Sequence, residues 1–207
     1  MDFHVDNRHV AVKHALAAIL ECHLGADPCA GRTVVERIDE RRIAVCDKRT
    51  SHLLGPGHFA VVETWRDQQM FDARDAVQKH LLDTLQPIRV SDYDQRPYKT
   101  LTVGSAAPLS ASSQAISVVT HVDTVAAPQA PALLKRLAEA SRREEGNVRF
   151  DVVQHAMRAN HFTVIETWQN QKALDAHAAA AHTRQYRDEL HPVTGSPIDE
   201  RVYKAVQ

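Results

Sequence analysis

The alternation of apolar and polar positions predicts an α+β fold. In the second half of the chain, four stretches have the alternation or the β-branched content of strands: 116–122, 148–154, 161–168 and 198–203. Apolar residues at helical spacing follow Pro131, and a second helical stretch follows Asn170, a favourable N-cap residue. Gly146 is expected directly after the first helix, at its C′ position. The resulting order, β-α-β-β-α-β, is the ferredoxin-like arrangement.

The first half of the chain follows this pattern less regularly. Apolar residues over 12–23 fit one face of a helix, yet residues 17–24 fit an opening strand as well. Residues 34–38 and 43–47 have the pattern of strands joined by a turn. Both alternatives for the opening segment stay open, and the first 50 residues are expected to depart from the regular arrangement.

An internal repeat divides the chain into two modules. The segment 58–65 recurs as 161–168 with six of eight residues identical, and the later tails 94–99 and 199–204 share Asp, Arg, Tyr and Lys. Between the copies lies a stretch rich in Ser, Ala, Gly and Pro without periodicity, which is typical of a linker. We therefore predict a first, degenerate module over 1–100, a linker over 101–114 and a second module over 115–207.

Charge and apolar runs exclude several classes of protein. The chain has 25 basic and 26 acidic residues and a formal net charge of -1, so no broad basic surface points to nucleic acid. The first residues lack the pattern of a signal peptide, and the longest apolar run, 15–20, is too short to span a bilayer. We expect a cytoplasmic protein with neither nucleic acid nor membrane as a partner.

The cysteine and histidine content argues against a metal site. Cys22, Cys29 and Cys46 form no C-x-x-C pair, which disfavours both a disulfide framework and a thiolate zinc site. Among the 13 histidines, His177 and His182 form the one close pair in a predicted helix. A spacing of five residues places them about 140° apart around a continuous helix. We therefore predict no metal.

A signature in the second module resembles that of the antibiotic biosynthesis monooxygenase family. The strand ends in E-T-W at 166–168, the next helix carries L-D-A-H at 174–177, and His182 follows five residues later. The resemblance covers most of residues 116–206. It implies a dimeric α/β barrel, in which two antiparallel sheets pack face to face as in a homodimer. Two modules in one chain would supply both sheets as an internal pseudo-dimer. A homodimer of whole chains also stays open.

The first module keeps half of this signature. Its strand ends in the same E-T-W at 63–65, but Arg74 stands where the equivalent of His177 is expected. Lys79 or His80 meets the position of His182. Because a base must be neutral to accept a proton and arginine stays charged at pH 7, any chemistry is expected in the second module.

The family resemblance implies a function class. The family includes cofactor-free oxygenases of anthrones and quinols, haem-degrading enzymes and isomerases. The asparagine that the anthrone oxygenases carry four residues before the strand tryptophan is Val164 here, and Arg187 stands where the haem-degrading branch has its iron ligand. The resemblance therefore implies a cofactor-independent monooxygenase acting on a quinol or related small aromatic with molecular oxygen. The alternatives are a non-catalytic, small-ligand-binding or stress-associated barrel, and an isomerase or lyase that uses the same histidines.

Residue roles follow from the signature. A histidine suits the role of base because its ordinary pKa lies near neutrality, so His177 and His182 are the catalytic candidates. The implied substrate contacts are Trp168, Tyr186 and His121.

The repeated residues predict a structural network in both modules. The two tryptophans hold equivalent positions, and each shares a strand face with the glutamate two residues before it. Each glutamate is expected to be buried and paired with an arginine of the tails, or to be exposed at an edge. The predicted members are Glu63, Trp65, Arg96, Glu166 and Arg201.

Overall fold

The computed structural model describes residues 16–23, 42–46, 58–65, 94–104, 114–125 and 127–205, with the single positions 79, 83, 86 and 87. The strands are β1 (Leu16–His23), β2 (Arg42–Cys46), β3 (His58–Trp65), β4 (Asp94–Thr102), β5 (Ile116–Asp123), β6 (Asn147–His155), β7 (His161–Trp168) and β8 (Asp199–Ala205). The helices are α3 (Ala130–Ser141), α4 (Gln171–Ala179), α5 (Ala181–Leu190) and the short 3₁₀ turn η1 (His191–Val193).

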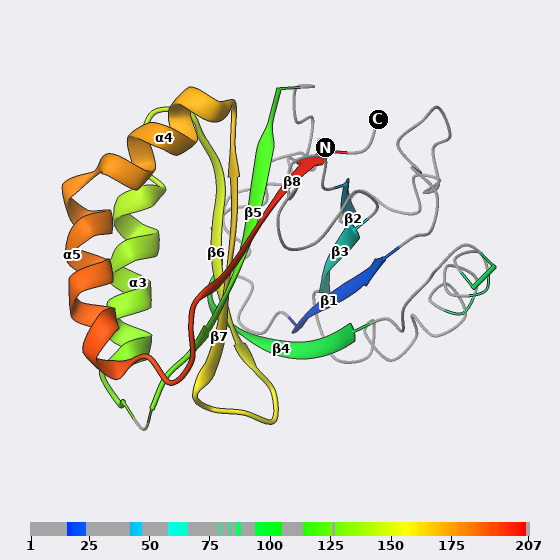
Figure 1. Ribbon diagram of the computed structural model, residues 1–207, viewed down its shortest axis with the longest axis horizontal. Coiled ribbons are helices and arrows are strands. Elements are labelled where there is room, and N and C mark those ends of the chain that lie inside the picture. Colours follow the sequence, from blue (N-terminus) through cyan, green and yellow to red (C-terminus); the bar gives the residue numbers. More distant parts are fainter. Residues whose placement is uncertain are drawn as a thin grey trace, which may run out of the picture.

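These strands form one closed antiparallel barrel in the order β1-β3-β2-β8-β5-β7-β6-β4. The first half of the chain supplies β1 to β4 and the second half supplies β5 to β8. Within each half the strands follow the ferredoxin-like order, and helices α3, α4 and α5 cover the outer face of the second half (Figure 1). The predicted tandem pseudo-dimer is confirmed.

The register of the strands repeats between the halves. Trp65 pairs with Leu16, and Trp168 pairs with Ile116, each partner being the first residue of its strand. The two tryptophans therefore hold equivalent backbone positions, as the sequence repeat predicts.

The last strand of each half crosses to the other half. β4 pairs with β6, and β8 pairs with β2, so these two contacts close the barrel. β4 runs to Thr102 and takes in the first two residues of the predicted linker. The two sheets thus share one hydrogen-bonded wall, and their inner faces enclose a common interior.

The predicted element types are largely confirmed. The opening segment of the first half is strand β1, so the strand alternative is confirmed. β2 overlaps the second predicted strand of that region and begins one residue earlier. Residues 34–38 lie outside the described residues. Asn170 caps α4, since its Oδ1 accepts a hydrogen bond from the Ala173 amide at 3.0 Å.

The predicted role of Gly146 was wrong. Helix α3 has Pro131 in its first turn as expected, but it ends at Ser141 with Arg142 as its C-cap. Gly146 lies in the following turn, with a φ of 82°, and the amide of Gln169 bonds to its carbonyl oxygen at 2.9 Å. It therefore shapes the entry into β6 rather than the end of the helix.

Strand alternation separates two cores. On β7, Phe162, Val164 and Trp168 face the helices, while Ile165 faces the barrel interior with Tyr98. The outer core includes Val122, Leu133, Leu134, Leu137, Phe150, Phe162, Val164, Trp168 and Leu190, all at most 5% exposed.

No helix in the described part of the chain is long and apolar enough to cross a bilayer.

Replacing Gly146 with alanine should destabilise the protein by about 1–3 kcal/mol, because the backbone is in the left-handed region. The new Cβ would also lie 2.6 Å from the Cβ of Ala173. Urea unfolding followed by circular dichroism measures the change. Adding Ala173→Gly removes the contact but not the backbone strain, so it should restore only part of the loss. Wild-type stability in Gly146→Ala would contradict this account.

Candidate functional site

A break between two helices brings the signature histidines together. Ala180 separates α4 from α5 with φ -65° and ψ 146°, an extended conformation. His177 lies near the end of α4 and His182 near the start of α5, with ring centroids 5.9 Å apart. The prediction that the two side chains diverge was wrong because it assumed one continuous helix. The spacing of His177 and His182 therefore no longer argues against a metal site.

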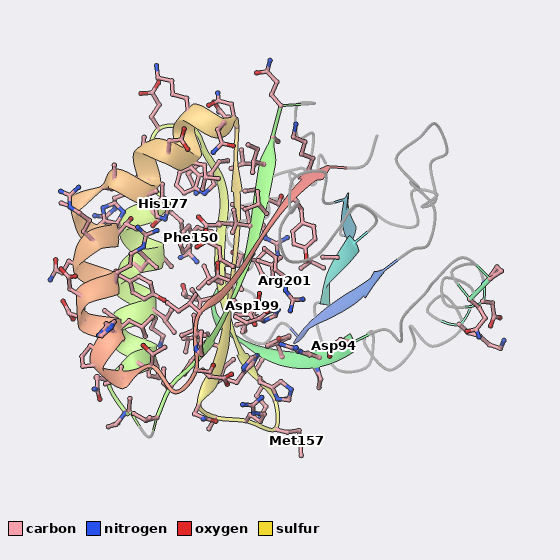
Figure 2. All side chains as sticks on the ribbon, in the orientation of Figure 1. Asp94, Phe150, Met157, His177, Asp199 and Arg201 are labelled. Carbon is pink, nitrogen blue, oxygen red and sulfur yellow. The ribbon has the colours of Figure 1, made fainter. Side chains whose placement is uncertain are left out.

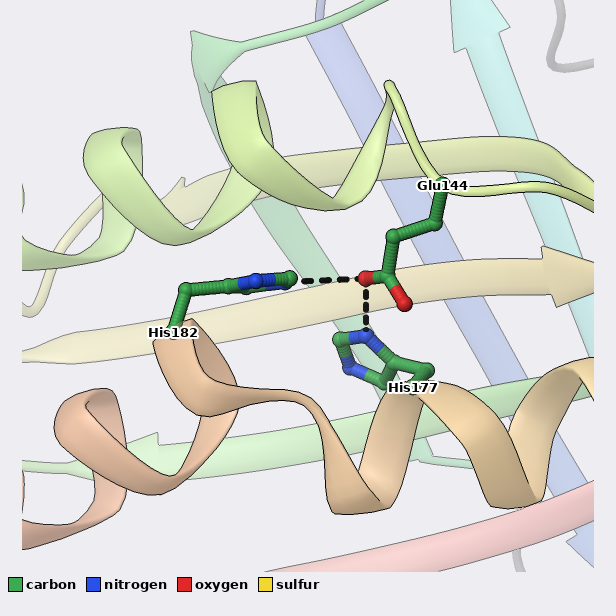
Figure 3. Close-up of side chains that lie close together, drawn as sticks. All are labelled: Glu144, His177 and His182. Carbon is green, nitrogen blue, oxygen red and sulfur yellow. Dashed lines mark hydrogen bonds and ion pairs between the residues drawn. The ribbon is translucent and has the colours of Figure 1, made fainter.

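Glu144 bridges the two histidines (Figure 3). Its Oε1 lies 2.6 Å from Nδ1 of His177 and 2.9 Å from Nε2 of His182. Glu144 belongs to the turn segment between α3 and β6, and sequence reasoning missed it because no motif surrounds it. When its carboxylate is ionised, both rings donate an N–H to the same oxygen.

The opposite side of His177 faces aromatic rings and a second carboxyl group. The imidazole stacks on Trp168 at a centroid distance of 4.6 Å and meets the edge of Phe150 at 5.5 Å. Its Nε2 lies 3.6 Å from Oε2 of Glu166, which also accepts a hydrogen bond from Nε1 of Trp168 at 2.6 Å. Figure 2 shows His177 and Phe150 between the helices and the sheet. One imidazole thus lies between two carboxyl groups.

Burial sets the protonation of this site. It raises the pKa of Glu166 to about 7, an effect that the Trp168 hydrogen bond only partly opposes. Burial also lowers the pKa of His177 below its ordinary value, although the hydrogen bond to Glu144 acts in the other direction. His177 is therefore neutral at pH 7. With Nδ1–H donated to Glu144, its lone pair is on Nε2, toward Glu166.

The predicted substrate contacts fall on two faces of the sheet. Trp168 is fully buried and Tyr186 nearly so, and both belong to the outer core around His177. Burial raises the pKa of Tyr186 above its ordinary value. His121 lies on the inner face instead, with Nδ1 2.9 Å from Oγ1 of Thr163. The sheet separates His121 from the histidine pair.

Glu166 is buried as expected, but the expected pairing with Arg201 was wrong. Arg201 pairs in register with Val119 and shares its inner face, whereas Glu166 faces the helices. Arg201 instead bonds to Asp199. In the tail of the first half, Arg96 makes the equivalent bond to Asp94.

In both tails the arginine therefore bonds to the aspartate two residues before it. Of the other predicted network members, the side chains of Glu63 and Trp65 lie outside the described part, as does Arg74.

A second group of histidines lines the barrel interior. His161 stacks between His121 and Tyr98, at 5.7 and 6.2 Å between ring centroids. Its Nδ1 lies 2.9 Å from Oδ1 of Asp123, which also binds Arg158. Burial lowers the pKa of His161, although the bond to Asp123 opposes this effect. Burial alone would raise the pKa of Asp123, but His161 and Arg158 together hold it below its ordinary value.

Comparison with known proteins finds a family match in the second half of the chain. Residues 117–189 match the sequence profile of the antibiotic biosynthesis monooxygenase family, and this range contains Glu144, His177 and His182. The match covers 73 of the 207 residues, all of them in the second half of the chain. The matched range contains helices α3 and α4 and the three residues of the site.

Individual proteins that are similar to this chain extend the comparison. The Bacillus subtilis protein "Putative monooxygenase YcnE" is 29% identical over 63 residues, which are 30% of this chain and 66%, just under two thirds, of that protein. A crystal structure of a "Putative monooxygenase" from Fusobacterium nucleatum is similar over 93% of each chain, with a TM-score of 0.76 and 13% identity. One from Lactobacillus acidophilus is similar over 94% of this chain and 95% of its own, with a TM-score of 0.73 and 14% identity. At such identities these two structures establish the shared fold.

The stability of the protein should fall in mild acid, partly through His161. The unfolded chain binds a proton near pH 6.5, whereas the buried ring binds one only at lower pH. The contribution of the neutral His161 to stability is therefore fully present above about pH 6.5, and it is lost as the pH falls through the folded-state pKa of His161. Urea unfolding at pH 7 and pH 5 should show a smaller difference for His161→Gln than for wild type. A variant of the exposed His191 serves as the control, and an unchanged pH dependence in His161→Gln would refute the assignment.

Proposed function

We propose that the chain is a monooxygenase-like enzyme that oxidises a quinol or a related small aromatic with molecular oxygen and without a bound cofactor. The observation that carries the proposal is the hydrogen bond of 2.6 Å between Glu144 and Nδ1 of His177, made beside Trp168 in the half that matches the family. A carboxylate that holds one ring nitrogen leaves the other free to act as a base.

The geometry gives each member of this site a distinct role. Glu144 fixes the ring and stabilises the positive charge that develops when Nε2 accepts a proton from a substrate hydroxyl. Oε2 of Glu166, held by the Trp168 indole, lies 3.6 Å from Nε2 and receives the new N–H of the imidazolium. His182, whose side chain is 30% exposed, is the solvent-facing partner of Glu144.

Deprotonation starts the oxygen chemistry. A phenolate is electron-rich enough to pass electrons to oxygen, so the enzyme needs to create the anion and protect it from water. The rings of Trp168 and Phe150 supply apolar walls beside the base. The overall reaction balances for a quinol: one quinol and one O₂ give one hydroxyquinone and one water, with the substrate as the source of electrons.

Replacing His177 with glutamine should lower the turnover of a hydroquinone by about two to four orders of magnitude, the usual contribution of a positioned base. Glutamine can still donate a hydrogen bond to Glu144 but cannot accept the proton. An oxygen electrode measures uptake across a panel of hydroquinones for wild type, His177→Gln and the control His191→Ala. His191 is exposed and lies beyond α5, so its variant should keep the wild-type rate.

The same assay separates the alternatives. A monooxygenase consumes one O₂ per quinol and releases no peroxide, so added catalase should return no oxygen. Turnover that persists without oxygen would favour the isomerase or lyase alternative. Binding without turnover would favour a ligand-binding protein, and a wild-type rate in His177→Gln would remove this histidine from the mechanism.

A further inference from the structure

We propose that Glu144, His177 and His182, here named the bridging triad, form a binding site for one divalent transition-metal ion. The proposal concerns binding and goes beyond the proposed function. It starts from the convergence of three ligand atoms of the right chemistry, Oε1 of the glutamate, Nδ1 of His177 and Nε2 of His182 (Figure 3).

The spacing of these atoms is close to that of a metal site. All three lie within 4.8 Å of one another, and each nitrogen is within 2.9 Å of the carboxylate oxygen. Around a tetrahedral zinc with bonds of about 2.0–2.1 Å, ligand atoms are about 3.3 Å apart. Nδ1 of His177 therefore needs to move away from the oxygen by about 0.7 Å and Nε2 of His182 by about 0.4 Å. Two imidazoles and one carboxylate suit Zn²⁺, Fe²⁺, Co²⁺, Ni²⁺ and Cu²⁺ rather than Mg²⁺ or Ca²⁺.

The triad has both freedom to adjust and access from solvent. Glu144 comes from the turn segment between α3 and β6, and the two histidines come from separate helices joined at Ala180. The side chain of His182 is 30% exposed and that of Glu144 is 17% exposed, whereas that of His177 is 6% exposed. An ion can thus enter from the side of His182 and keep one coordination position open to water.

A second carboxyl group provides independent support. Metal-bound histidines usually donate their other ring N–H to a carboxylate or carbonyl, which fixes the ring and its tautomer. Nε2 of His177, the nitrogen that points away from the triad, faces Oε2 of Glu166 at 3.6 Å. The Trp168 indole holds that carboxyl group in place. His177 thus has the surroundings of a metal-bound histidine, with Nδ1 facing the triad and Nε2 facing a carboxyl group.

Metal binding should inhibit the proposed reaction. An ion takes the lone pair of Nδ1 and moves the N–H to Nε2, the atom proposed to act as the base. This corollary rests on the proposed function, whereas the binding itself does not.

The direct test is a titration of the full chain after treatment with a chelator. Zn²⁺ is measured by competition with a chromophoric chelator, and Co²⁺ by its visible absorption. Glu144→Gln and His182→Ala should each weaken binding at the triad at least tenfold, while the exposed His191→Ala should match wild type. Far-UV circular dichroism checks the fold of each variant. His182→Ala is expected to disturb the fold less than Glu144→Gln, because the side chain of His182 is partly exposed.

The indole of Trp168 reports where the ion is held. In Trp65→Phe, Trp168 is the one remaining tryptophan, and its ring stacks on His177 at 4.6 Å. Co²⁺ or Cu²⁺ at the triad should quench its fluorescence saturably, and in Glu144→Gln the quenching should require at least tenfold more of the ion. Equal affinity in wild type, Glu144→Gln and His182→Ala, or no quenching, would overturn the proposal and leave the oxygen assay unaffected. Metal binding without oxygen uptake would overturn the proposed function alone.

Discussion

Closure of the barrel is the constraint on which the rest of the structure depends. β4 pairs with β6 and β8 pairs with β2, so no strand of the described barrel is left with an open edge. Because the inner faces of all strands then enclose one interior, the outer face of β5 to β8 has to be covered from elsewhere. Helices α3, α4 and α5 provide that cover, and the space between them and β7 becomes the place of the site.

The site itself depends on the interruption of a helix. Residues 171–190 would form one helix of ordinary composition, but Ala180 adopts an extended conformation and divides it. The break turns His182 toward the carboxylate that His177 already contacts. Burial then acts on the groups nearest to the sheet, keeping His177 neutral and raising the pKa of Glu166 to about 7. A local backbone feature thus decides which side chains meet, and their depth decides their charge.

The sequence predicted most of the fold and part of the site. Strand alternation, Asn170 and the repeated E-T-W sufficed for the ferredoxin-like order and for two equivalent halves, because these signals are local. The helix break at Ala180 could not be predicted, since alanine favours a continuous helix. Glu144 was missed because its role depends on contacts with residues more than thirty positions away. Arg201 was assigned to the wrong face because its register in the barrel follows from β8 pairing with β5.

Joining both halves of the barrel in one polypeptide changes how the assembly responds to its surroundings. In a barrel made of two separate chains, association is bimolecular, and dilution favours dissociation. Here the tether between β4 and β5 makes the pairing intramolecular, so the effective concentration of one half around the other is fixed by the chain. Every substitution is also present once per barrel instead of twice. One half is therefore free to diverge toward a purely architectural role while the other keeps its histidines.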